Sequence, residues 1–193
     1  DEANKLYEEV EKSGGDFQIV NRARLGSANS LLLAGDYNGV LDKAKNYLEV
    51  DSDSEDALRM RSMQAGAYEK MGKLDEAISI HYTIMQDYIG SVGVSAPACE
   101  KMMKLLWERG KGTYADNRDG TFEHTDKWNA WNRGANYVKM VEPMFEDAET
   151  SSQIPKSERD AFTRVRNLVS TYGDNAAVRE ETRREQADRA KYN

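Results

Sequence analysis

Cysteine, histidine and proline are scarce in this 193-residue chain, and each scarcity excludes a class of structure or site. The single cysteine, Cys99, excludes an internal disulfide framework and a cysteine cluster for zinc, and its apolar neighbours predict a small buried side chain. Neither His81 nor His124 has a second ligand at a recognised metal spacing. No metal is therefore predicted: His81 is expected to pack in a core or interface, and His124 to lie in a loop or at a helix start. With only three prolines, the chain favours long helices.

Long hydrophobic runs and a dense positive charge are also missing. No run of 18 or more apolar residues occurs, so no transmembrane segment is predicted. The net charge of -7 disfavours a nucleic-acid partner, because phosphate binding needs a basic face. Residues 1–155 hold 18 Lys and Arg against 27 Asp and Glu, or -9, whereas residues 156–193 hold 9 against 7. The acidic body permits a basic protein partner without requiring one.

Catalytic motifs are absent too. The chain has no phosphate-binding glycine loop, nucleophile elbow or zinc-binding helix motif, and its carboxylates follow solvated helical faces. We therefore expect no enzyme and no cofactor. The residues around Gly120 resemble part of a calcium loop, but Ala115 stands where its first carboxylate belongs. Asp119 and Gly120 are better explained as the turn of a small β-hairpin between Thr113-Tyr114 and Thr121-Phe122.

What is present is a pattern stated twice, 37 residues apart. Each copy begins with a glycine and continues as an apolar run with helical spacing: Gly35, Tyr37, Val40, Leu41, Ala44, Tyr47 and Leu48, then Gly72, Leu74, Ala77, Ile78, His81, Ile84 and Met85. A fixed period of this size indicates a helical-repeat array in which each unit buries its apolar face against the next.

The pattern predicts an all-α fold of antiparallel helical hairpins. A first helix is expected from Phe17 to Ala34, with Gly35 as a left-handed turn and Asp36 as the cap of a second helix that runs to about Val50. A capping box of Ser52 and Glu55 would begin a third helix. That helix would end at Gly72, and a fourth would run from about 74 to 88.

These residues resemble the tetratricopeptide repeat (TPR) family, whose unit is two antiparallel helices stacked into a superhelix. The matching residues are small or aromatic positions and turn glycines: Ala28, Ala65, Tyr68, Gly35, Gly72 and Ala77. The family's tryptophan is replaced by Arg24 and Arg61, and its late small residue by Tyr47 and Ile84. Large residues at that close helix contact push the helices apart, so a looser superhelix is expected.

The remaining chain is read as an interrupted third repeat and a C-terminal cap. One helix is expected from about Pro97 to Arg109, then an insertion over 111–125, then an aromatic helix capped by Thr125 and ended by Pro143. Two further helices would follow, the first closed by Gly173. The prediction is a single helical-repeat domain over 1–193, divided into an N-terminal helix (1–15), repeat 1 (16–52), repeat 2 (53–92), degenerate repeat 3 (93–148) and capping helices (154–193).

The resemblance implies protein or peptide binding on the concave surface of the first helices, as a scaffold or adaptor. The repeat register projects this surface onto six residues: Arg22, Asn29, Arg59, Ser62, Lys104 and Trp107. Family members that grip a C-terminal carboxylate use five positions, which are here Leu25, Asn29, Met63, Pro97 and Lys101. Two of these five fit at best, so that clamp is not predicted.

A second hypothesis is recognition of a small molecule or glycan by an aromatic cluster in the interrupted repeat. The candidates are Tyr114, Phe122, Trp128 and Trp131, with Trp107 beside them. The same residues would also pin the insertion to the helices, and both interpretations stay open. The start at Asp1 fits signal-peptide removal and also fits trimming; we expect an exported, extracytoplasmic protein, with the cytoplasm as the alternative.

Overall fold

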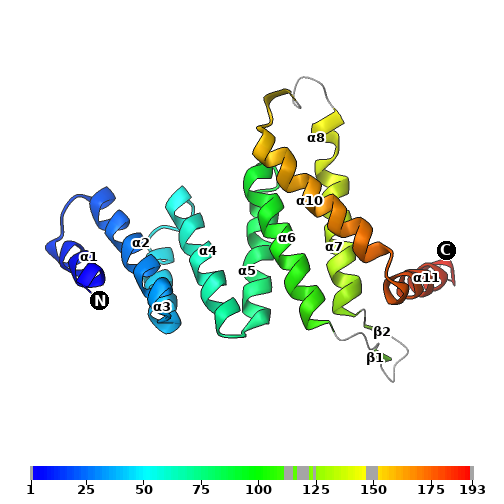
Figure 1. Cartoon of the computed structure of the whole chain (residues 1–193), viewed down its shortest axis with the longest axis horizontal. Helices are drawn as coiled ribbons and strands as arrows, with labels where there is room; N and C mark the ends of the chain where they lie inside the picture. The colour runs from blue at the N-terminus through cyan, green and yellow to red at the C-terminus, as the bar shows by residue number, and fades with distance from the viewer. Residues whose placement is uncertain (1, 111–114, 117–121, 124, 147–151, 192–193) are drawn as a thin grey trace. The chain divides into compact units, whose positions relative to one another are not determined.

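The computed structural model describes all residues except 1, 111–114, 117–121, 124, 147–151 and 192–193. The described residues form helices joined by turns and loops, with one pair of two-residue strands, which confirms the predicted all-α class (Figure 1). The chain forms two compact units, unit 1 over Asp1–Ile80 and unit 2 over His81–Asn193. The sequence predicted one domain with repeat boundaries at 52 and 92, and the boundary between the units coincides with neither.

Unit 1 contains α1 (Glu2–Ser13), α2 (Phe17–Ala34), α3 (Tyr37–Leu48), α4 (Glu55–Lys70) and the beginning of α5 (Leu74–Asp87). Gly35 and Gly72 end α2 and α4 with φ values of 81° and 71°, the left-handed conformation that glycine adopts without a steric penalty. The two turn glycines and the bounds of α2 are those that the 37-residue pattern predicts.

The helix starts in unit 1 confirm one predicted cap and correct another. The Asp36 side chain accepts a hydrogen bond from the Gly39 amide at 3.0 Å, as expected for the cap of α3. The cap of α4 is Ser54, which accepts from the Ala57 amide at 3.0 Å, and not Ser52. Asp51 explains the difference because its carboxylate accepts from the Ser54 amide at 3.2 Å and closes the turn before Ser54.

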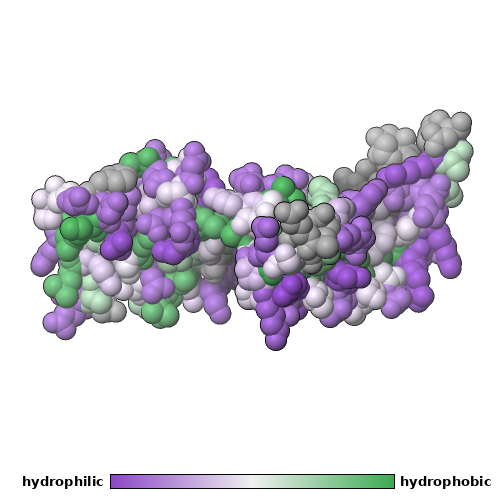
Figure 2. Space-filling model, turned by 90° about the horizontal axis from the view of Figure 1, so that it is seen from above, coloured by the Kyte–Doolittle hydropathy of each residue, from purple (hydrophilic) through white to green (hydrophobic). Residues whose placement is uncertain are grey.

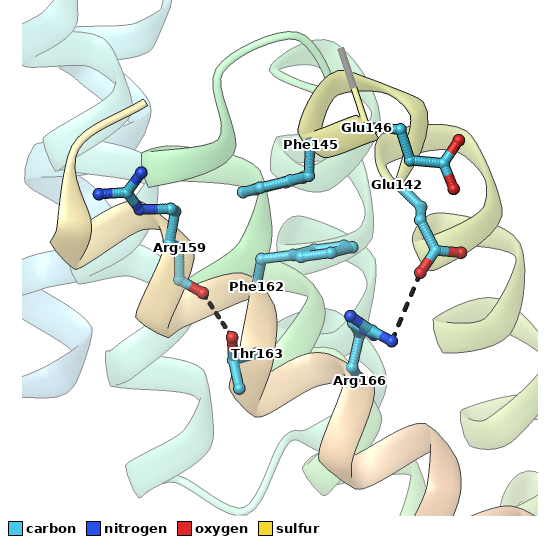
Figure 3. A pocket seen from close by; sticks show the side chains of 7 residues that line it. All are labelled: Glu142, Phe145, Glu146, Arg159, Phe162, Thr163 and Arg166. Atoms are coloured by element: carbon cyan, nitrogen blue, oxygen red, sulfur yellow. Dashed lines mark hydrogen bonds and ion pairs between the residues drawn. The ribbon is translucent and has the colours of Figure 1, made fainter. Parts of the chain in front are cut away.

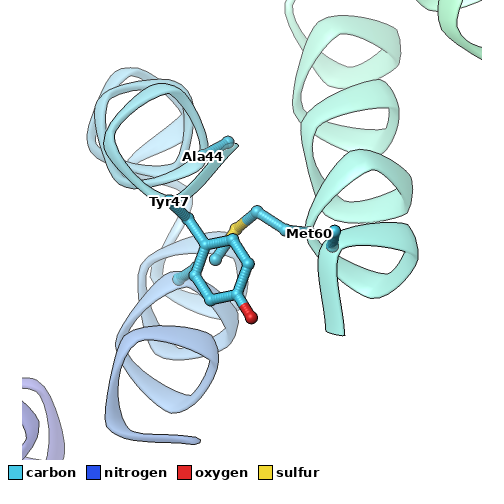
Figure 4. Close-up of a cluster of buried hydrophobic side chains, with 5 residues drawn as sticks. Ala44, Tyr47 and Met60 are labelled. Carbon is cyan, nitrogen blue, oxygen red and sulfur yellow. The ribbon is translucent and has the colours of Figure 1, made fainter. Parts of the chain in front are cut away.

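The core of unit 1 lies among α2, α3 and α4, which contact one another pairwise. One buried cluster of this core combines three alanines, Ala28, Ala44 and Ala57, with the larger Tyr47 and Met60. Figure 4 shows the Tyr47 ring and the Met60 side chain filling the space between α3 and α4. Tyr47, the large residue for which the TPR resemblance implied a looser helix contact, is fully buried.

Unit 2 contains the end of α5, α6 (Val92–Arg109), β1 (Ala115–Asp116), β2 (Phe122–Glu123), α7 (Asp126–Val141), α8 (Pro143–Glu146), α10 (Lys156–Gly173) and α11 (Ala176–Lys191). β1 and β2 pair antiparallel. The residues predicted as the turn between them, Asp119 and Gly120, lie outside the described residues.

Helix α6 begins five residues before the predicted start at Pro97. Proline removes one helical hydrogen bond, and the carbonyl left without its donor is that of Gly93, an exposed residue. The Gly93 amide, which has no helical partner so near the helix start, donates to the Glu158 carboxylate of α10 at 3.1 Å. A cap from a distant helix therefore permits the earlier start.

Helices α6, α7 and α10 pack against one another and form the core of unit 2. A β-carbon on Gly134 of α7 would lie 2.5 Å from the Met103 sulfur of α6, so this glycine permits the close approach of the helices. Tyr137 is fully buried, and its hydroxyl lies 2.9 Å from the Ser95 hydroxyl. Helix α10, predicted to cover the open end of a stack, is thus a full member of this core.

The two predictions of burial are confirmed. Cys99 is fully buried in α6, and burial raises the pKa of its thiol, so it remains protonated and unreactive. His81 is 8% exposed. Among the described residues, no helix combines the length and the apolarity that crossing a bilayer requires.

Candidate functional site

The four predicted partner residues of unit 1 are all exposed, on the outer faces of α2 and α4. Arg22 and Asn29 lie two helical turns apart on one face of α2, and Arg59 and Ser62 lie one turn apart on α4. Figure 1 shows α2 and α4 side by side, and the two helices are in contact. Because α2 and α4 are in contact and α3 packs against both, the exposed residues of α2 and α4 are considered together as one candidate surface.

Two of these four side chains are already engaged within unit 1. Arg59 forms ion pairs with Glu55 and Asp56, and the Ser62 hydroxyl donates to the Leu58 carbonyl at 2.9 Å. By contrast, Arg22 and Asn29 form no hydrogen bond or ion pair with any described residue. The polar groups that remain for a partner are therefore concentrated on α2.

The exposed face of α2 is longer than the sequence analysis proposed. Gln18, Arg22, Asn29 and Leu33 lie within one stripe, and Leu33 is 81% exposed. On α4 the stripe continues from Arg59 and Ser62 to the open side of Gly66 and to Lys70. We call these eight residues the α2–α4 face.

The repeat register contains the signal for the residues that the sequence analysis missed. Leu33 and Lys70 are 37 residues apart, as are Asn29 and Gly66. Large apolar side chains are exposed elsewhere in unit 1 too: Leu6, Ile19 and Val50. Figure 2 shows hydrophobic surface over unit 1, at the left, between hydrophilic side chains.

A shallow hollow of about 300 Å³ adjoins the Arg22 end of the α2–α4 face. It is lined by polar side chains only: Gln18, Asn21, Arg22, Asp51, Ser54 and Asp56. Hydrogen bonding, first from the Ser54 side chain, holds the pKa of Asp51 below its ordinary value. The Tyr47 hydroxyl also donates to the Asp51 carboxylate at 3.3 Å. Asp51 is thus a fixed negative charge on the side of the hollow opposite α2.

The remaining two predicted partner residues belong to unit 2 and are engaged there. Lys104 forms an ion pair with Glu100 at 2.7 Å. The Trp107 ring stacks on Tyr172 of α10 at a centroid distance of 3.8 Å, and the Lys127 ammonium lies 5.5 Å from its centroid. Tyr172 therefore covers one face of the indole, and the ammonium makes a cation–π contact with the ring. A common surface for all six predicted residues stays a prediction.

The aromatic cluster of the second hypothesis is mostly packed. Trp128 is 4% exposed, and its indole nitrogen donates to the Thr182 hydroxyl of α11 at 3.2 Å. Trp131 is half-buried and meets Trp128 edge to face, with ring centroids 6.2 Å apart. Its indole nitrogen would lie 2.9 Å from a β-carbon on Gly173, so Gly173 serves this approach and does not end α10 in a left-handed turn.

The other two members of that cluster are Tyr114 and Phe122. Tyr114 lies outside the described residues, and Phe122 is described only as part of β2. No sequence pattern links Tyr172 to Trp107, because the two residues lie 65 positions apart.

Glu181 is an unforeseen buried charge beside this cluster. Its carboxylate is 0% exposed and accepts two hydrogen bonds from Thr125, at 2.6 Å from the amide and 2.7 Å from the hydroxyl. Thr125 in turn caps α7 by accepting from the Trp128 amide at 3.2 Å. The carboxylate therefore lies at the positive end of the α7 dipole and attaches α11 to α7.

A second hollow, of about 360 Å³, lies between α10 and the α7–α8 corner of unit 2 (Figure 3). Phe145 and Phe162 stack with their centroids 4.5 Å apart and form its apolar part. Arg166 pairs with Glu142 at 3.6 Å across the opening, while Glu146 and Arg159 extend the rim. Both charge signs surround this hollow in equal number, so it favours no ligand of one charge.

No candidate metal centre was found in the described part of the chain, where no group of three or more His, Cys, Asp or Glu side chains gathers suitably. Comparisons with protein-family models, with curated proteins and with solved structures found no match to this chain.

Proposed function

We propose that the protein is a non-catalytic module that binds a protein or peptide segment on the α2–α4 face, as a scaffold or adaptor with TPR-like helical hairpins. The proposal is supported by the two left-handed glycine turns 37 residues apart and by the mutual packing of α2, α3 and α4. A partner would meet a rigid helical surface, which lowers the ordering cost of association.

The observation that carries the proposal is the state of the α2 stripe. Arg22 and Asn29 have no partner among the described residues, and the large Leu33 side chain on the same stripe is almost fully exposed. Several other charged side chains of the core helices are paired, as Lys43 is with Glu11 and Arg109 with Asp126. Unpaired hydrogen-bonding groups beside an exposed apolar residue are typical of a binding surface.

The aromatic cluster supports the alternative less well. A glycan stacks on an open aromatic face, whereas Trp107 is stacked on Tyr172 and Trp128 is buried. We therefore place ligand recognition on unit 1 and interpret the tryptophans as packing.

Site-specific photo-cross-linking tests the proposed function. A photoreactive amino acid placed at Leu33 should form a cross-link to a discrete partner in cells that produce the protein naturally. The matched control carries the same group at Asn46, which is exposed on α3. A partner captured from position 33 and absent from position 46 is expected. Equal capture from both positions, or none from position 33, would contradict the proposal.

A further inference from the structure

We infer that the segment bound on the α2–α4 face is acidic, and that its main chain lies against Gly66. The inference rests on the proposed function and adds the chemistry of the partner. It is carried by the unpaired charges of the face and by a glycine that unit 1 does not need for its own packing.

The unpaired charges of the α2–α4 face are all positive. Arg22 and Lys70 form no hydrogen bond or ion pair with any described residue. None of the eight residues of the face is acidic, and the nearby carboxylates of α4, Glu55 and Asp56, are ion-paired with Arg59. No residue of α2 is acidic, although unit 1 as a whole holds 16 Asp and Glu against 10 Lys and Arg, or -6. Charge complementarity therefore favours carboxylates on the partner, against the overall charge of the unit.

Gly66 has no packing role within unit 1. It lies in the middle of α4 with helical φ, where glycine is less favourable than alanine, and a β-carbon built on it meets nothing within 4 Å. Gly26 and Gly134, the mid-helix glycines of α2 and α7, instead face atoms 2.5 Å from such a β-carbon. The open side of Gly66 leaves room for an approaching main chain, between Ser62 and Lys70 on the same stripe.

The spacing of these features sets the size of the occupant. Arg22 and Leu33 are 11 residues apart on α2. At about 1.5 Å per residue they span roughly 16 Å, the length of about five extended residues. A short segment with carboxylates toward Arg22 and Lys70 and an apolar side chain on Leu33 fits the face.

Selection from a random 12-residue peptide library displayed on phage tests the inference with the intact chain. Bound peptides are expected to be enriched in Asp and Glu, at least threefold over the unselected library. The Arg22→Glu, Lys70→Glu double variant should lose this enrichment. The control double variant Lys12→Glu, Lys45→Glu changes the net charge equally at exposed positions of α1 and α3 and should keep it.

The outcomes separate the inference from the proposed function. If no peptide is enriched, both are overturned. If peptides are enriched without acidic preference, or if the preference survives Arg22→Glu with Lys70→Glu, the proposed function stands and the inference is wrong. Basic or purely apolar consensus peptides fall in this second group.

The role of Gly66 is tested with a selected acidic peptide and a fluorescence-anisotropy titration. Gly66→Ala should weaken binding at least fivefold while raising the thermal midpoint of the free protein. The two opposite effects exclude a loss of binding through misfolding. Unchanged affinity in Gly66→Ala would overturn the placement of the main chain at this residue.

Discussion

At the scale of single residues, glycine has three separate roles in this chain. Gly35 and Gly72 adopt positive φ and end helices. Gly134 leaves space for the Met103 side chain between α6 and α7. Gly66 does neither and faces open space. The three roles differ in what a methyl group would do, so alanine substitutions distinguish them.

Gly134→Ala and Gly66→Ala form a matched pair with opposite expected signs. A β-carbon at 134 would lie 2.5 Å from Met103 and 3.0 Å from Val169, so overpacking should cost about 1–3 kcal/mol of unfolding free energy. Alanine at 66 should add about 0.5–1 kcal/mol through helix propensity. Urea unfolding measures both. A destabilised Gly66→Ala would show that Gly66 has a packing role after all.

Tyr137 gives a prediction at alkaline pH. Burial raises its pKa to about 12, and the Ser95 hydrogen bond opposes only part of this effect. The folded state therefore holds the phenolic proton more tightly than the unfolded state, whose tyrosines titrate near 10. The stability that results is fully present below about pH 10 and is lost as the pH rises from 10 towards 12.

Urea unfolding of the natural protein and of Tyr137→Phe between pH 8 and 11.5 checks this dependence. The natural protein should lose stability more steeply above pH 10, because phenylalanine has no proton to release. Tyr47 and Tyr172, whose pKa values are also raised by burial, remain in both proteins and cancel in the comparison. Parallel curves of stability against pH for the two proteins would show that folding does not raise the pKa of Tyr137.

At the scale of helices and strands, the 37-residue pattern was sufficient to predict the features that depend on neighbouring residues in the sequence. It predicted α2, both glycine turns and the Asp36 cap, because each depends on residues within one turn of the chain. It failed at the start of α6 and at the anchoring of α11. Those features depend on Glu158 and Glu181, which reach helix ends 65 and 56 residues away. Sequence spacing carries no signal of such contacts.

For the candidate site too, some features could be predicted from the sequence and others depend on contacts that only the structure gives. The repeat register located Arg22, Asn29, Arg59 and Ser62 on exposed helix faces. Which of them are unpaired depends on neighbours such as Glu55 and Asp56, and only the structure gives that. The tryptophans looked like a ligand site in sequence because the packing of Tyr172 on Trp107 comes from a distant helix.

The attachment of α11 gives a prediction at this scale. Only Val178 and Glu181 of this helix are buried, so the Glu181 carboxylate is its main anchor. Glu181→Gln should cost about 1.5–3 kcal/mol of unfolding free energy, because a charged acceptor is lost at Thr125. It should also speed amide exchange at Thr125.

The matched control is the neighbouring Glu180→Gln, whose side chain is half exposed and paired with Arg184. A change within about 0.5 kcal/mol is expected there. Similar losses in the two variants would show that Glu181 contributes no more than a surface ion pair.

At the scale of the whole molecule, the two units differ in their charge and in their proposed function. The excess of acidic residues lies in unit 1, yet the charged residues of its α2–α4 face, Arg22, Arg59 and Lys70, are all cations. Unit 2 pairs many of its described charges internally and buries its tryptophans partly or fully. We therefore expect binding to be confined to unit 1 and to weaken as salt screens the cations.

Amide hydrogen exchange of the intact chain, with and without a library-selected acidic peptide, tests this account most directly. The peptide should slow exchange in α2 and α4 and leave α7, with Trp128 and Trp131, unchanged. Slowed exchange confined to α7, with α2 and α4 unchanged, would contradict the account and favour the aromatic cluster as the binding site.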